Sequence, residues 1–131
     1  AIEFLENAIE LYRAPFLNSE QDYETSWVEK RQSEIHEMYG EALSILATHK
    51  YNEGLIEHAL GYYLSALKIL NHREEIVEKV MRIYQDRDQL QDALELYHWI
   101  EKNLQSDYGI DPNSVLKALA DEIRQALDNE G

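Results

Sequence analysis

Hydrophobic residues recur every three or four positions along most of the chain, the spacing of one face of an α-helix. The apolar stripes lie within residues 2–12, 23–49, 55–70, 76–84, 90–104 and 115–127. No stretch alternates between apolar and polar residues with a period of two, as a half-buried strand would. The pattern therefore predicts an all-α fold of about six helices.

Turn and capping residues separate these stripes. Residues 51–54 (Tyr-Asn-Glu-Gly) indicate a turn, and Gly109 ends the fifth helical region. Asn71 with Glu74, and Asp88 with Gln91, have the spacing of a capping box. Asp111 followed by Pro112 predicts the N-cap and first turn of the last helix.

The chain matches itself when position 59 is laid on position 93. Ala59-Leu60-x-x-Tyr63 is then repeated as Ala93-Leu94-x-x-Tyr97, and Leu70 falls on Leu104. The offset equals the tetratricopeptide period of about 34 residues, in which paired helices stack into successive units. The match predicts tetratricopeptide-like helical hairpin repeats, with a small residue where two helices cross most closely. A chance agreement between amphipathic helices is the alternative.

The repeat is degenerate at other positions. Ala47 takes the small position in the first helix of unit one, whereas Met81 is a poor fit in unit two. The proline that usually ends a repeat is replaced by Asn71 and by Gln105. We therefore expect irregular units.

The charge limits the possible partners. The chain of 131 residues has 12 Lys and Arg against 26 Asp and Glu, a net charge of −14, and no cysteine. Disulfides and thiolate metal sites are excluded, and direct binding to a phosphate backbone is disfavoured. No apolar run approaches the ~20 residues of a membrane span, and no signal peptide opens the chain. We expect a cytoplasmic protein without membrane contact.

Two ordered sets of residues resemble a known family. Leu11–Leu17 (Leu-Tyr-Arg-Ala-Pro-Phe-Leu), followed by Trp27 and Arg31, is similar to the opening of the bacterial transcriptional activation domain. The Ala-Leu-x-x-Tyr stretch at 93–97 and Tyr-Gly-Ile-Asp-Pro at 108–112 resemble its closing part. The resemblance covers nearly the whole chain and points to regulators like the Streptomyces antibiotic regulatory proteins.

The chain departs from the family pattern at several turns. Ala14 stands where the family usually has glycine and Tyr108 where it has leucine. Asn71-His72 replaces a common Asp-Pro turn, and the turn glycine is missing at residues 86–88. These departures affect loop geometry more than the fold.

The resemblance implies a regulatory role without catalysis. In such regulators the helical module follows a DNA-binding domain and mediates dimerisation or contact with that domain or the transcription machinery. A receiver or nucleotide-binding module is attached in some members. Residues 1–131 would then form a single domain of a longer regulator, an interpretation that the abrupt start inside a helical pattern supports. The alternatives are a free-standing tetratricopeptide-type adaptor for a peptide or protein, and an enzyme or metal-binding bundle.

Four residues are candidates for a protein interface. Trp27 and Arg31 project from one helix face, so the guanidinium can lie over the indole or reach a carboxylate. They can anchor a DNA-binding domain, or simply clamp the first helix against the repeats. Tyr62 and Trp99 fall beside the apolar stripes, where exposed aromatic side chains can mark an interface.

The repeat register also predicts a groove along the first helix of each unit. Its candidate residues are Glu41, Ser44, Thr48, Glu75, Glu78 and Arg82. Because the set is polar and net negative, the groove should favour a basic or polar segment. A solvated helix face is the simpler alternative.

Catalytic and metal-binding patterns are weak. Among five histidines, only Glu95 and His98 have the Glu-x-x-His spacing of a di-iron bundle, which needs two such pairs. No nucleophile elbow, phosphate loop or dinucleotide-binding glycine pattern occurs. We predict no catalytic residue, no metal and no cofactor.

Overall fold

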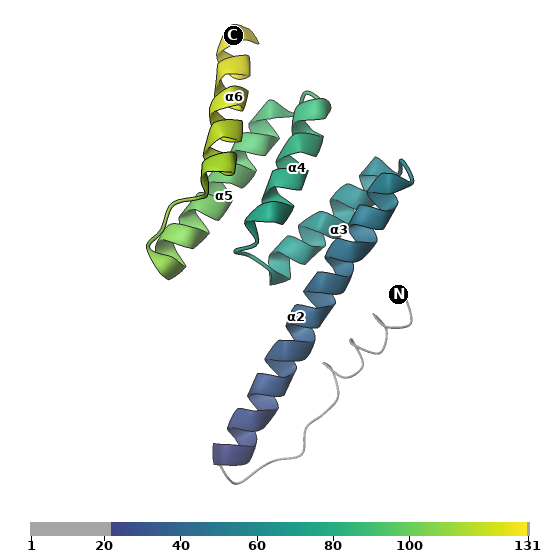
Figure 1. The fold of residues 1–131 in the computed structure, drawn as a ribbon, viewed down its shortest axis with the longest axis vertical. Helices are drawn as coiled ribbons and strands as arrows, with labels where there is room; N and C mark the ends of the chain where they lie inside the picture. The colour runs from purple at the N-terminus through teal and green to yellow at the C-terminus, as the bar shows by residue number, and fades with distance from the viewer. Residues whose placement is uncertain (1–21, 131) are drawn as a thin grey trace.

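The computed structural model describes residues 22–130, which form five α-helices and no strand (Figure 1). These helices are α2 (Asp22–Asn52), α3 (Ile56–Ile69), α4 (Glu74–Asp86), α5 (Leu90–Tyr108) and α6 (Ser114–Glu130). The all-helical fold class is confirmed for this part of the chain. The first predicted helix, at residues 2–12, lies outside the described residues.

The helices pack mainly on their neighbours in the sequence. The contacts join α2 with α3, α3 with α4, α4 with α5 and α5 with α6, and α6 also touches α4. Helix α3 runs back along the second half of α2, and α5 runs back along α4 (Figure 1). The core thus lies between two successive helical hairpins and is closed at one end by α6.

The turns inside the two hairpins have the same backbone geometry. Gly54 after α2 and Asp88 after α4 both have a left-handed conformation, with φ of 83° and 58°. In the first turn the Leu55 amide donates to the Lys50 carbonyl at 3.0 Å, and in the second the Gln89 amide donates to the Tyr84 carbonyl at 2.7 Å. This bond from the residue after the left-handed position closes a Schellman-type helix end. The two turns are therefore separated along the chain by the same offset as the sequence match.

Burial follows the same period. Ala59 and Ala93 are both fully buried, and so are Ala47 and Met81. Tyr63 is 2% exposed and Tyr97 is 3% exposed. Met81 therefore occupies the interior position that the repeat assigns to it, although its side chain is much larger than that of Ala47.

Gly40 allows α2 to approach the end of α3 closely. A Cβ atom at this position would lie 2.9 Å from Ile69 Cγ2 and 2.9 Å from Leu70 Cγ. Such distances are too short for ordinary contact, so a glycine is needed unless both side chains move. The sequence pattern marked Gly40 only as an interruption, whereas α2 continues through it without a break.

Both predicted capping boxes are wrong. Helix α4 begins at Glu74 after Arg73, and α5 begins at Leu90 after Gln89, with no side-chain cap at either start. Asn71 instead lies in the preceding turn, where its carbonyl accepts a hydrogen bond from Asn103 Nδ2 at 3.1 Å. The turn is held by a helix distant in the sequence, which no local pattern reveals.

The predicted cap of the last helix is displaced by two positions. Asn113 Oδ1, and not Asp111, accepts a hydrogen bond from the Leu116 amide at 2.9 Å. The Asn113 amide in turn donates to Glu74 Oε2 at 2.6 Å, which joins the start of α6 to the start of α4. The prediction that Gly109 ends the fifth helix is confirmed by its left-handed C-cap, with φ of 66°.

Candidate interaction surface

Two adjoining hollows lie between α2 and α4 and are called here the α2–α4 hollows. One, of about 270 Å³, is lined by Thr48, Tyr51, Asn52, Tyr63, Lys79, Arg82 and Ile83. The other, of about 400 Å³, is lined by Ser44, Ile45, Thr48, His49, Asn52 and Lys79. Three of the six predicted groove residues, Ser44, Thr48 and Arg82, therefore border one surface.

A hydrogen-bonded pair forms the floor between α2 and α3. Thr48 Oγ1 lies 3.1 Å from the Ser44 carbonyl oxygen and donates to it. Because the threonine hydroxyl has a single proton, the Tyr63 hydroxyl must donate to Thr48 Oγ1, 2.8 Å away. Lys79 Nζ lies 5.8 Å from the Tyr63 ring centroid, within the range of a cation–π interaction. The two helices and Lys79 are thus tied together at the hollow.

The three predicted acidic groove residues are each close to an arginine. Arg73 lies 2.5 Å from Glu41 and 3.5 Å from Glu75, and Arg82 Nε lies 3.0 Å from Glu78 Oε2. The hydrogen bond to Glu41 raises the pKa of the Arg73 guanidinium above its usual value. Counting charges along the sequence therefore overstated the negative charge that this surface offers to a ligand.

A third hollow, of about 360 Å³, lies at the turn between α3 and α4. Its lining consists of Ser33, His36, Glu37, Ile69, Leu70, Asn71, His72, Arg73 and Tyr108. His72 Nε2 lies 2.5 Å from Asp107 Oδ2, and the His72 and Tyr108 rings meet edge to face at 4.7 Å.

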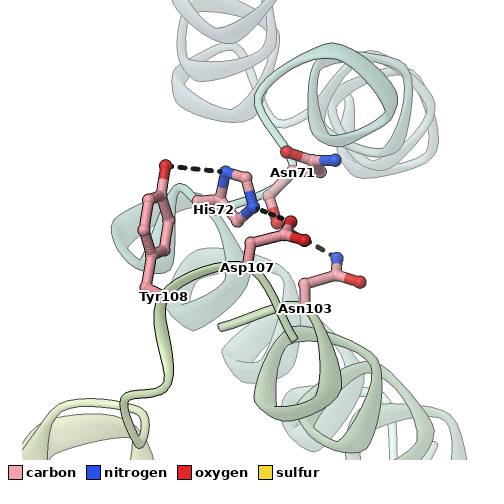
Figure 2. A network of polar contacts seen from close by, with 5 residues as sticks. All are labelled: Asn71, His72, Asn103, Asp107 and Tyr108. Carbon is pink, nitrogen blue, oxygen red and sulfur yellow. Dashed lines mark hydrogen bonds and ion pairs between the residues drawn. The ribbon is translucent and has the colours of Figure 1, made fainter. Parts of the chain in front are cut away.

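This network ties the α3–α4 turn to the end of α5 (Figure 2). The Asp107 carboxylate can only accept, so His72 Nε2 donates to it. In the neutral ring, His72 Nδ1 is then an acceptor for the Tyr108 hydroxyl, 3.4 Å away. We interpret the arrangement as a structural tie, because both of its partners come from the last turn of α5 and hold a turn in place.

The four candidate interface residues come from three helices. Trp27 is 58% exposed on α2, and Trp99 is 36% exposed on α5. Tyr62 is half-buried and packs against the core. Within residues 22–130, Arg31 neither stacks on Trp27 nor forms an ion pair, so the expected contact between them is not observed.

The described helices also bear on metal binding and on membrane crossing. Among residues 22–130, no group of three or more His, Asp or Glu side chains could hold a metal ion. His98 Nδ1 lies 3.3 Å from Glu101 Oε1. None of the helices in this range is both long enough and apolar enough to cross a membrane.

Lys79, Tyr51 and Asn52 were missed as groove residues by the sequence reasoning. They follow from the same register, because Lys79 lies one turn after Glu75, and Tyr51 and Asn52 lie one turn after Thr48. Tyr51 and Asn52 were missed because α2 was expected to end at His49, whereas it continues to Asn52.

Comparison with known proteins gives one match. The model of the bacterial transcriptional activator domain family matches residues 1–124. No curated protein and no solved structure matches the chain.

Proposed function

The chain belongs to the bacterial transcriptional activator domain family, and on this premise we propose that it is a regulatory module that acts through protein contacts. Its partners would be a second copy, the DNA-binding domain of its own regulator, or the transcription machinery. The module would carry out no catalysis. We also predict that it is one part of a longer regulator.

We further propose that α2–α3 and α4–α5 are tetratricopeptide-like units. The observation that carries this proposal is the repetition, at the period of the sequence match, of one turn with its hydrogen bonds and left-handed residue. In helical repeats of this period the first helices of successive units border a shared binding surface. The α2–α4 hollows lie between the two helices that would have this role.

Direct binding of this chain to DNA is not part of the proposal. A net charge of −14 repels a phosphate backbone, and phosphate contacts require clustered Lys and Arg. We expect no retardation of duplex DNA at physiological salt. Tight and salt-sensitive binding in a mobility-shift assay would contradict this expectation.

The proposed function can be tested by attaching the chain to an unrelated monomeric DNA-binding domain. One reporter gene would have a single binding site for the DNA-binding domain. This reporter responds if the chain contacts the transcription machinery. A second would have two adjacent half-sites, which responds if the chain dimerises. The DNA-binding domain alone, expressed at the same level, is the control.

We expect at least one reporter to respond above this control. If neither responds while circular dichroism shows that the fusion is helical, binding to the chain's own DNA-binding domain must be measured directly. Absence of that binding as well would exclude the proposed function.

A free-standing adaptor for a peptide is the second candidate function. The α2–α4 hollows favour this function, because their aromatic, amide and cationic side chains can bind a peptide. Such binding needs no attached DNA-binding domain. An adaptor would bind its peptide with both reporters silent, so the two functions give different results.

A further inference from the structure

The α2–α4 hollows have a charge opposite to that of the whole chain. Acidic residues outnumber basic ones by 26 to 12, yet no Asp or Glu of the described helices lines either hollow. The charged side chains in their linings are Lys79 and Arg82. An evenly acidic surface would not produce two adjoining hollows bordered by cations.

Lys79 is the central cation of this surface. It lines both hollows, and within residues 22–130 its ammonium group has no carboxylate partner. The ammonium group instead faces the Tyr63 ring, with Nζ 5.8 Å from the centroid. By contrast, Arg82 is paired with Glu78 at 3.0 Å, although its side chain remains 52% exposed. Lys79 can therefore take an external anion without breaking an ion pair.

The walls also provide apolar and hydrogen-bonding groups. Tyr51 is 43% exposed and Ile45 is 66% exposed, and both border the hollows. The Asn52 side chain, common to both hollows, offers an amide donor and an amide acceptor. A ligand that suits these groups has negative charge, an apolar side chain and a backbone able to pair with an amide.

We propose that the α2–α4 hollows bind an acidic protein segment that contains an aromatic or long aliphatic side chain. Its carboxylates pair with Lys79 and Arg82, and its apolar side chain packs on the exposed Tyr51 and Ile45. The proposal rests on the proposed function, in that the module acts through protein contacts, and it names the chemistry of one partner. It replaces the basic ligand that the sequence alone suggested.

The recognition must be short-ranged. At physiological ionic strength the screening length is about 8 Å, so the acidic remainder of the chain repels a distant acidic segment only weakly. A nucleic acid is a poorer occupant, because its phosphates would extend beyond two cations onto an acidic surface. An acidic peptide can confine its charges to the hollows.

The test uses the purified chain labelled with ¹⁵N and the unlabelled peptide Gly-Asp-Glu-Phe-Asp-Glu-Gly. We expect amide shifts centred on Thr48, Asn52, Lys79 and Ile83. Lys79→Gln should weaken binding about fivefold, as an exposed ion pair would. Lys30→Gln removes the same charge from an exposed position on the first half of α2 and should leave the affinity unchanged.

Two further probes separate the sources of affinity. The peptide with Asn and Gln in place of Asp and Glu should lose most of its binding. Inorganic phosphate alone should not reproduce the shifts, because it lacks the apolar side chain that packs on Tyr51 and Ile45. Equal shifts from phosphate would identify a simple anion site and overturn the proposal.

The remaining outcomes are also decisive. No shift at about 1 mM peptide, shifts centred on Arg73 and His72, or equal weakening by Lys79→Gln and Lys30→Gln would each refute the acidic-segment site. Failure of this test with responding reporters rejects the ligand chemistry and leaves the regulatory module. Peptide binding with silent reporters and no binding to the chain's own DNA-binding domain rejects the module as a regulator and leaves the adaptor.

Discussion

The α2–α3 and α4–α5 hairpins have the same turn but different side chains. In the first, glycine occupies the left-handed position at Gly54, and in the second Asp88 does so. The buried position on the first helix is Ala47 in one hairpin and Met81 in the other. The small residue on the second helix is alanine in both, at 59 and 93.

This comparison separates strict from adaptable requirements. At the fully buried positions 59 and 93 both hairpins have alanine, and a larger side chain there would have to displace its neighbours. At the left-handed turn, aspartate can replace glycine, since Asp is one of the few residues that tolerate this conformation. The interior position on the first helix of each hairpin accepts side chains of different size, since it is Ala47 in one hairpin and Met81 in the other and both are fully buried.

The largest expected effect is from Met81→Ala, which gives the second hairpin the residue of the first. Met81 is fully buried, and truncation should leave a cavity and lower the free energy of unfolding by about 2–5 kcal/mol. Met81→Leu conserves volume and should cost less than about 1.5 kcal/mol. Urea denaturation monitored by circular dichroism measures both. A cost below about 1 kcal/mol for the alanine variant would mean that the neighbours collapse into the space.

The next test enlarges the buried alanine that each hairpin has on its second helix. Ala59→Leu and Ala93→Leu should each reduce the free energy of unfolding by about 1–3 kcal/mol, because neither side chain has space to grow. Ala118→Leu on the exposed face of α6 is the matched control and should stay within about 0.5 kcal/mol. Unequal costs at 59 and 93 would show that the two crossings are not equivalent.

Two glycines should respond to alanine with opposite sign. Gly40→Ala places Cβ 2.9 Å from side-chain atoms of Ile69 and Leu70, and should destabilise the chain by about 1 kcal/mol despite the better helix propensity. Gly61→Ala meets no atom within 4 Å and should stabilise it by about 0.5–1 kcal/mol. Thermal midpoints of the two variants against the parent decide the sign.

The smallest effects concern the left-handed turn. Gly54→Ala should cost about 1 kcal/mol, because alanine is strained at φ of 83°. Asp88→Gly relieves the equivalent strain and should stabilise by roughly 0.5 kcal/mol. Denaturation midpoints at neutral pH would measure both changes, and a destabilised Asp88→Gly would show that its side chain has another role.

The stabilisation by Asp88→Gly should depend on pH. The hydrogen bond to Asp88 and its negative charge raise the pKa of the Glu130 carboxyl. A carboxyl whose pKa is higher in the folded chain favours folding below its unfolded pKa of about 4.3, and that contribution disappears as the pH rises through the folded pKa. The advantage of Asp88→Gly over the parent should thus be greatest near neutral pH and shrink as the pH falls through the raised folded pKa of Glu130, and its pH-dependent part should be gone below about 4.3.

Helix positions were largely predictable, whereas helix starts were not. The second helix was expected at residues 23–49 and is observed at Asp22–Asn52, because a long apolar stripe is a strong periodic signal. The starts of α4 and α5 were misplaced, and at α4 the reason is that a capping box is a local pattern that competes with tertiary contacts. His72 bonds to Asp107 and Glu74 to the Asn113 amide, and both partners belong to later parts of the chain.

The candidate surface was predictable only in part. Ser44, Thr48 and Arg82 follow from the repeat register, and all three line the α2–α4 hollows. The register could not show that Arg73 approaches Glu41 and Glu75, nor that Lys79 lies over the Tyr63 ring. The sign of the charge offered to a ligand depends on these pairings.

The sequence by itself determined the helical class and the family of this protein, and it indicated the offset at which the two hairpin turns recur. These features are carried by spacing along one chain, and a helix face or a repeat needs no partner to be recognised. The tertiary structure decided which polar side chains meet, where α4 to α6 begin, and why Gly40 is required. These depend on how helices distant in the sequence cross, because a shift of one turn at a crossing changes every pair of facing side chains.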